Sequence, residues 1–173
     1  MKKGVIVIGG HVQGLGIVRI LGKQNIPIIV IDDKKYNLAR HSKYCDNFFL
    51  YKEDQLLRFL LKDEICNKYS QWLIFPTDDQ TIKVISKNLD ILKNIYKVST
   101  CEWSIISKFY NKINTYKLCE KLRIKAPYTV FPKDISDINN FKFQYPVIIK
   151  PAIMHKFYTK TKKKVFNFLI YFA

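Results

Sequence analysis

The sequence predicts an α/β fold built on a parallel β-sheet. Three observations support this prediction. Apolar runs that suit buried strands recur along residues 4–99, amphipathic stretches that suit helices separate them, and a glycine-rich turn joins the first strand to the first helix. Strands and helices that alternate in this order form a parallel sheet with helices on both faces.

The first strand and helix are the clearest elements. Residues 4–8 (GVIVI) form a continuous, β-branched run, which is typical of a strand buried on both faces. A second apolar run at residues 28–31 predicts the next strand. The segment between them has apolar residues at helical spacing, namely Ile17, Ile20 and Leu21.

The same alternation continues to residue 99. Further strands are predicted at residues 46–51, 72–76 and 95–99. One helix is predicted over 53–69, with an inward face of Leu56, Leu57, Leu60, Leu61 and Ile65. Another is predicted from residue 78 to 92, with Thr77 or Asp78 as its N-cap.

The pattern changes after residue 105, where we place a domain boundary between residues 1–105 and 106–173. Residues 102–123 contain no strand signal and predict two consecutive helices, with a break near Tyr110 and Asn111. A short helical stretch from Asp134 and a strand at 146–150 follow.

The glycine turn does not match the strict nucleotide-binding motifs. All 6 glycines lie within the first 22 residues. A dinucleotide fingerprint that starts at Gly14 would need a glycine where Arg19 stands. Gly9 and Gly14 have the spacing of the two P-loop glycines, but a P-loop would need lysine where Leu15 stands. We therefore interpret GGHVQGLG (9–16) as a structural turn between strand and helix.

A looser spacing leaves an alternative open. Glycines 10, 14 and 16 are spaced as in short-chain dehydrogenases, in which Asp32 and Asp33 would bind a ribose. Tyr158 and Lys162 also have the YxxxK spacing of that class. No serine lies within residues 143–157, where the dehydrogenase mechanism would require one.

Charge is concentrated in the second part of the chain. Residues 1–105 carry 16 basic and 11 acidic side chains, whereas residues 106–173 carry 14 and 3. Only four of the 30 basic residues are arginine, the residue that reads nucleic acids through bidentate contacts, so we expect no specific nucleic-acid partner. A second alternative therefore also remains, namely a non-catalytic module that binds an acidic partner through TKTKKK (159–164).

The four cysteines form no CxxC pair, and we expect them to be core residues in a reducing, cytoplasmic environment. No apolar run is long enough for a membrane span, so no membrane partner is expected.

Two segments of the second part resemble the start of an ATP-grasp domain. They are NKINTYKLCEKLRIKAPYTVFP (111–132) and YPVIIKPA (145–152). In that family a lysine opens a helix, a turn with proline and a strand follow, and a second lysine ends a later strand. The preceding unit resembles the Rossmann-like pre-ATP-grasp domain in its turn, GGHVQGLG, and in FPTDDQTI (75–82). More narrowly, residues 148–166 resemble the carboxylate–amine ligase branch.

The resemblance implies ATP as cofactor and two lysines as its ligands. Lys150 would contact the α-phosphate and the adenine edge, and Lys112 the β-phosphate. Strand alternation independently places Lys150 at a sheet rim. The resemblance also implies a phosphate-covering loop with His155, Lys156 and Tyr158, and a turn that faces substrate through Gly10, His11 and Gly14.

The implied reaction activates a small-molecule carboxylate with ATP to an acyl phosphate, which a small-molecule amine then attacks. The carboxylates that bind Mg²⁺ belong to a second subdomain in this family, and this sequence has no acidic residue beyond Asp137. We therefore expect an incomplete α+β subdomain over 106–173, a truncated protein that is not catalytic alone, and association through its exposed sheet edge.

Overall fold

The structure is a computed structural model that describes residues 3–134, 136–141, 146–161 and 168–170. The chain divides into two compact units, Met1–Ile106 and Ser107–Ala173. We call them the first and the second unit and describe each by itself. Among the described residues, no helix reaches the length and apolarity that crossing a membrane requires.

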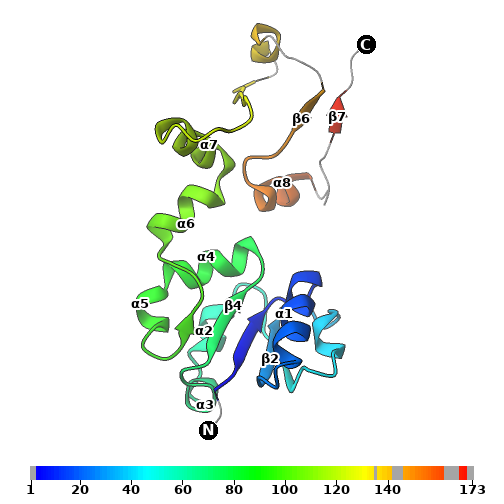
Figure 1. The fold of residues 1–173 in the computed structure, drawn as a ribbon, viewed down its shortest axis with the longest axis vertical. Coiled ribbons are helices and arrows are strands. Elements are labelled where there is room, and N and C mark those ends of the chain that lie inside the picture. The colour runs from blue at the N-terminus through cyan, green and yellow to red at the C-terminus, as the bar shows by residue number, and fades with distance from the viewer. Residues whose placement is uncertain (1–2, 135, 142–145, 162–167, 171–173) are drawn as a thin grey trace. The chain divides into compact units, whose positions relative to one another are not determined.

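A five-stranded parallel sheet forms the centre of the first unit (Figure 1). The strand order is β3-β2-β1-β4-β5, so the first strand of the chain lies in the middle. The strands are β1 (Val5–Ile8), β2 (Ile28–Asp32), β3 (Asn47–Leu50), β4 (Leu73–Pro76) and β5 (Lys97–Val98). The predicted α/β fold with a parallel sheet is confirmed.

Strand alternation divides the core of this unit into two layers. Ile6 of β1 and Ile29 of β2 face one side, where they pack with buried residues of α2 to α5. Val7 and Val30 face the other side and pack with Val18 of α1. The helices are α1 (Val12–Gly22), α2 (Leu56–Leu60), α3 (Asp63–Lys68), α4 (Asp79–Lys87) and α5 (Leu89–Leu92), with a 3₁₀ turn η1 (Ala39–His41).

The buried face of α1 differs from the sequence prediction. Ile20 is 68% exposed, whereas Gly14, Val18 and Gly22 are buried. The glycines lack side chains, so the helix approaches its neighbours along this stripe, and the larger Ile20 lies on the opposite face.

Two helices that were predicted to be continuous are each broken. The segment expected as one helix over 53–69 forms α2 and α3, because Lys62 has an extended backbone, with ψ of 135°. The segment 78–92 breaks at Asn88, whose side-chain amide donates to the Val84 carbonyl at 2.8 Å. This bond occupies a carbonyl that would accept the next backbone bond of α4.

The second unit has little buried surface. It contains α7 (Lys112–Lys121), a 3₁₀ helix η2 (Ser136–Asn140), α8 (Met154–Thr161) and a pair of antiparallel strands, β6 (Val147–Ile149) and β7 (Phe168–Ile170), while α6 (Trp103–Tyr110) spans the boundary between the units. None of the residues from 107 to 160 whose side chains the structure describes is buried.

The break between α6 and α7 lies at Asn111, close to the predicted position. The Asn111 side chain caps α7 by accepting from the Ile113 amide at 3.0 Å. The strand that the resemblance implies after this helix is absent: residues 124–132 form neither helix nor strand. Pro127 and Pro132 cannot donate to a ladder, and the Thr129 hydroxyl bonds locally to the Pro127 carbonyl.

Candidate functional site

The glycine turn lies at the carboxyl end of β1, the edge where parallel sheets usually bind ligands. Gly9 has a φ of +95°, which favours glycine. A methyl group on Gly9 would lie 2.3 Å from the Thr77 hydroxyl oxygen, and one on Gly10 would lie 2.1 Å from the Asn37 amide oxygen. One on Gly14 would lie 2.0 Å from the Gly9 carbonyl oxygen. These three glycines therefore serve close protein packing.

Both oxygens of the Asp32 carboxylate accept hydrogen bonds from backbone amides. Asp32 is 6% exposed, and its Oδ2 accepts from the Gly10 amide at 2.6 Å while its Oδ1 accepts from the Lys34 amide at 2.8 Å. The Gly10 amide is thus occupied and does not point at a phosphate. This geometry counts against Asp32 as a ribose ligand and against a phosphate cradle at the turn.

Asp33, the second residue considered for ribose, lies beside Asp32. Burial, and next a hydrogen bond with Asp32, raise the pKa of the Asp33 carboxyl above its ordinary value. Burial also raises the pKa of the Tyr51 phenol, and the nearby carboxylates of Asp33 and Asp78 raise it further. This part of the rim therefore disfavours added negative charge.

His11 and Thr77 meet at the same edge, although they are 66 residues apart in the chain. The Thr77 hydroxyl donates its one proton to the Ile8 carbonyl at 2.8 Å, with the Gly9 carbonyl as a second acceptor at 3.1 Å. At the 3.2 Å contact with His11 Nε2, the threonine oxygen must therefore accept. We assign the Nε2–H tautomer to neutral His11, which leaves Nδ1 as an acceptor without a hydrogen-bond partner among the described residues.

The sequence predicts Thr77 or Asp78 as the N-cap of α4, and Asp78 has this role. The Asp78 Oδ1 accepts from the Gln80 and Thr81 amides, both at 2.9 Å. The contact between Thr77 and His11 was missed because only the parallel pairing of β1 with β4 brings the two residues together.

The two predicted ATP lysines both belong to the second unit. Lys112 is the first residue of α7, and Lys150 directly follows β6 and is exposed. The Lys112 amide donates to the Ala152 carbonyl at 3.1 Å. The N-terminus of α7 therefore contacts the segment that begins at Lys150.

The segment expected to be a phosphate-covering loop is helical. His155, Lys156 and Tyr158 fall within α8, and Lys156 is exposed. The side chains of His155 and Tyr158, and the whole of Lys162, lie outside what the structure describes. The helix begins where the Phe157 amide donates to the Ile153 carbonyl at 3.2 Å.

The described residues do not by themselves form a magnesium site. No group of three or more His, Cys, Asp or Glu side chains is placed to hold a metal in this part of the chain. Each of the four cysteines is free, and Cys101 is exposed, contrary to the expectation that all four fill the core.

No protein-family model matches the chain. Over 98 residues it is 24% identical to the D-aspartate ligase of Enterococcus faecium, a match that covers 54% of this chain and 23% of the ligase. The crystal structure of N5-carboxyaminoimidazole ribonucleotide synthetase from Thermotoga maritima is similar over 88% of this chain and 39% of the synthetase, with a TM-score of 0.55 and 22% identity.

A further solved structure is N5-carboxyaminoimidazole synthetase from Staphylococcus aureus complexed with ADP, with a TM-score of 0.49 and 16% identity over 81% of this chain and 36% of that one. The chain thus spans well under half the length of each relative. It is partially similar to ATP-grasp ligases, over the N-terminal portion of their length.

Proposed function

We propose that this chain is the N-terminal part of an ATP-dependent carboxylate–amine ligase and that its second unit binds ATP through Lys112 and Lys150. The observation that carries the proposal is the 3.1 Å hydrogen bond between the Lys112 amide and the Ala152 carbonyl. It brings the backbone of Lys112 close to residue 152, two positions after Lys150, and we infer that both ammonium groups approach one polyphosphate.

The chemistry of these positions suits a nucleotide. Lys112 stands at the N-terminus of a ten-residue helix, where the backbone dipole adds to the attraction of the ammonium for phosphate. Lys150 follows a strand, which gives its backbone a defined position. The second unit also carries far more basic than acidic residues, and this charge attracts polyanions.

The complete ligase reaction would proceed in two steps. A carboxylate oxygen of the substrate attacks the γ-phosphorus of ATP, the bond to ADP breaks, and an acyl phosphate forms. The amine nitrogen then attacks the acyl carbon, the bond to phosphate breaks, and the nitrogen loses a proton. Mg²⁺ would accompany ATP, and we assign no ligand to it in this chain.

The glycine turn of the first unit would face the substrate through His11, because Gly10 and Gly14 are buried against the protein. The glycines hold the turn close to the sheet, and His11 offers Nδ1 as a hydrogen-bond acceptor. An amine donates hydrogen bonds, so His11 suits the amine rather than the carboxylate. We further propose that the chain alone binds ATP without completing the reaction.

Binding of a fluorescent ATP analogue to the full chain tests the proposal. Lys112→Ala and Lys150→Ala should each raise the Kd by about tenfold, since each removes a charge-assisted contact to phosphate. Lys117→Ala is the matched control, because Lys117 is an exposed lysine on the same helix. Equal affinities in all three variants would refute the ATP site.

Two further measurements separate the remaining alternatives. Phosphate release from ATP in the presence of D-aspartate, which carries both carboxylates and an amine, should stay at background for the chain alone. NADH binding that disappears in Gly14→Val would instead support the dehydrogenase alternative, whereas no NADH binding is expected here.

A further inference from the structure

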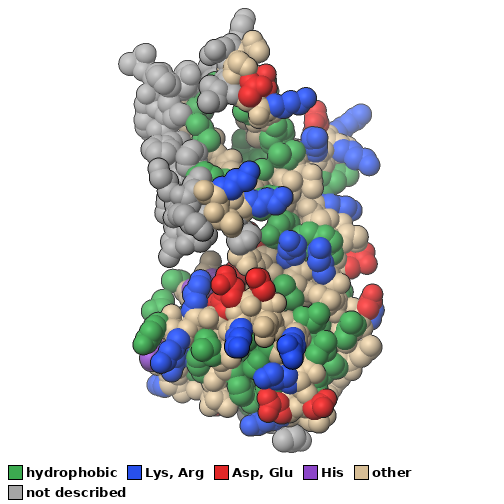
Figure 2. Space-filling model, turned by 180° about the vertical axis from the view of Figure 1, so that it is seen from behind, with side chains coloured by type: hydrophobic (Ala, Val, Ile, Leu, Met, Phe, Trp, Pro, Cys, Tyr) green, Lys and Arg blue, Asp and Glu red, His purple; other side chains and the backbone are tan. Residues whose placement is uncertain are grey.

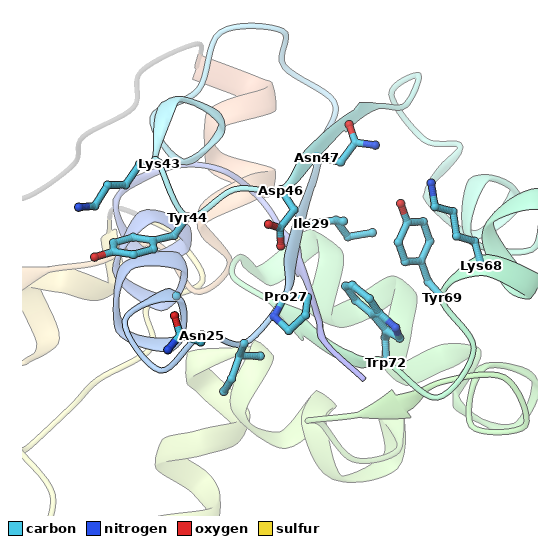
Figure 3. A pocket seen from close by; sticks show the side chains of 12 residues that line it. Asn25, Pro27, Ile29, Lys43, Tyr44, Asp46, Asn47, Lys68, Tyr69 and Trp72 are labelled. Atoms are coloured by element: carbon cyan, nitrogen blue, oxygen red, sulfur yellow. The ribbon is translucent and has the colours of Figure 1, made fainter. Parts of the chain in front are cut away.

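A hollow of about 530 Å³ lies at the edge of the first unit's sheet where the strands begin, opposite to the glycine turn (Figure 3). Its volume is within the range that is typical of small-molecule sites. Pro27, Asp46 and Trp72 line it from the positions directly before β2, β3 and β4. The proposed ligase function uses none of these residues.

Two glycines fix the aromatic walls of this hollow. A methyl group on Gly22 would come within 2.3 Å of the Tyr44 Cβ, so Tyr44 packs directly on α1. One on Gly4 would come within 2.6 Å of the Trp72 ring, which also packs edge-on against Tyr69 at 5.0 Å between centroids. In Figure 3 Tyr44 lies on one side of Pro27 and Trp72 on the other. The walls are therefore backed by the fold.

Polar atoms lie between these walls. The Asp46 Oδ2 accepts from the Ile28 amide at 2.6 Å, which orients the carboxylate and leaves Oδ1 without a hydrogen bond within the described residues. The Asn47 Oδ1 accepts from the Phe48 amide at 2.9 Å, which leaves its side-chain NH₂ group as a donor. The hollow thus offers an acceptor and a donor beside aromatic rings.

Two lysines stand at opposite ends of the hollow in Figure 3. The Lys43 ammonium lies 5.1 Å from the centroid of the Tyr44 ring, and the Lys68 ammonium lies 5.5 Å from that of Tyr69. Neither forms a salt bridge within the described part of the chain. The residues that line the hollow include two lysines and one carboxylate, that of Asp46, so their net charge is positive and favours an anion.

We propose that this hollow binds a planar heteroaromatic anion, of which a nucleoside monophosphate is an example. The ring would stack on the aromatic walls and hydrogen-bond to Asp46 and Asn47, while Lys43 and Lys68 would attract the anionic group. The site is independent of Lys112 and Lys150, because all its residues belong to the first unit.

Tryptophan fluorescence reports on this site directly. The chain has 2 tryptophans, Trp72 and Trp103, and Trp103→Phe leaves Trp72 as the only one. Titration of this variant with AMP should quench the fluorescence of Trp72 to saturation. Adenosine, which lacks the phosphate, should bind about tenfold more weakly. No quenching at millimolar AMP, or equal binding of adenosine and AMP, would overturn the proposal.

Single lysine substitutions in the Trp103→Phe background test which lysines contribute to AMP binding. Lys43→Ala and Lys68→Ala should each raise the Kd for AMP by about threefold to tenfold, whereas Lys52→Ala should leave it unchanged. Lys52 is exposed, follows β3 and does not line the hollow. Circular dichroism must show equal folding, and an equal loss in all three variants would overturn the assignment.

A last variant separates this site from the ATP site. In Lys112→Ala, quenching of Trp72 by AMP should persist with unchanged Kd even if binding of the ATP analogue is lost. Quenching that disappears in Lys112→Ala would assign the AMP effect to the second unit and refute the hollow.

Discussion

The Gly10 amide donates to the Asp32 Oδ2 over 2.6 Å, and this bond joins the turn after β1 to the end of β2. Asp32 is buried, so its loss leaves the buried Gly10 amide without an acceptor and also removes the acceptor of the part-buried Lys34 amide. The acidic side chains visible in Figure 2 lie at the surface, whereas Asp32 is buried. Its role is architectural.

Asp32→Ala should therefore destabilise the first unit strongly. The expected loss is about 1.5–3 kcal/mol in the free energy of unfolding, measured by urea denaturation. Asp90→Ala is the control, because the Asp90 side chain is exposed in its pair with Lys93 and should cost less than about 0.5 kcal/mol. Equal losses in the two variants would contradict the structural role of Asp32.

Two glycines of α1 should respond to the same substitution with opposite signs. Gly14→Ala should destabilise by about 1–3 kcal/mol, because the new methyl group meets the Gly9 carbonyl oxygen at 2.0 Å. Gly16→Ala should stabilise by about 0.5–1 kcal/mol, because apart from its chain neighbours and the adjacent helix backbone no atom lies within 4 Å of the new methyl group, and alanine favours helix. Thermal unfolding of both variants checks the contrast, and the same sign for both would refute it.

Thr77→Val should change the tautomer of His11. The substitution keeps the shape of the side chain but removes the oxygen that accepts from His11 Nε2. The ¹⁵N chemical shifts of the imidazole should report one predominant Nε2–H form in the wild type and a mixture of the two neutral tautomers in Thr77→Val. His41, which is exposed, serves as the internal reference. A wild-type mixture equal to that of His41 would contradict the assignment.

Asp33→Asn should change how stability depends on pH. In the folded state the pKa of Asp33 is raised above its ordinary value of 3.8. Above pH 3.8 the folded state therefore binds more protons than the unfolded state. Its stabilising contribution is full below pH 3.8 and is lost as pH rises through the raised pKa. The stability of Asp33→Asn relative to wild type should therefore increase with pH above 3.8.

Urea denaturation between about pH 3.5 and 7 measures this difference. Asp90→Asn provides the comparison at an exposed position, and its difference from wild type should change less across the same range. A difference for Asp33→Asn that stays constant over the range would show that the carboxyl has no raised pKa in the folded state.

The sequence by itself determined the positions of the strands of the first unit and the class of its fold. The continuous runs of Val and Ile in β1 and β2 indicate strands buried on both faces, and period-two geometry sends successive side chains to opposite sides. Local signals also narrowed the N-cap of α4 to Thr77 or Asp78 and predicted the break near Tyr110 and Asn111, because a cap needs only a side chain and amides two or three residues away.

Only the tertiary structure decided what the polar residues and glycines do. Gly14 and Gly16 belong to one helix, yet only Gly14 faces the Gly9 carbonyl, and no periodicity reveals which neighbour packs there. The position of Asp32 after β2 also suits a ribose ligand, but in the fold its two oxygens accept from the Gly10 and Lys34 amides. The pair of His11 and Thr77 depends on β1 lying beside β4, a non-local contact that local sequence patterns do not encode.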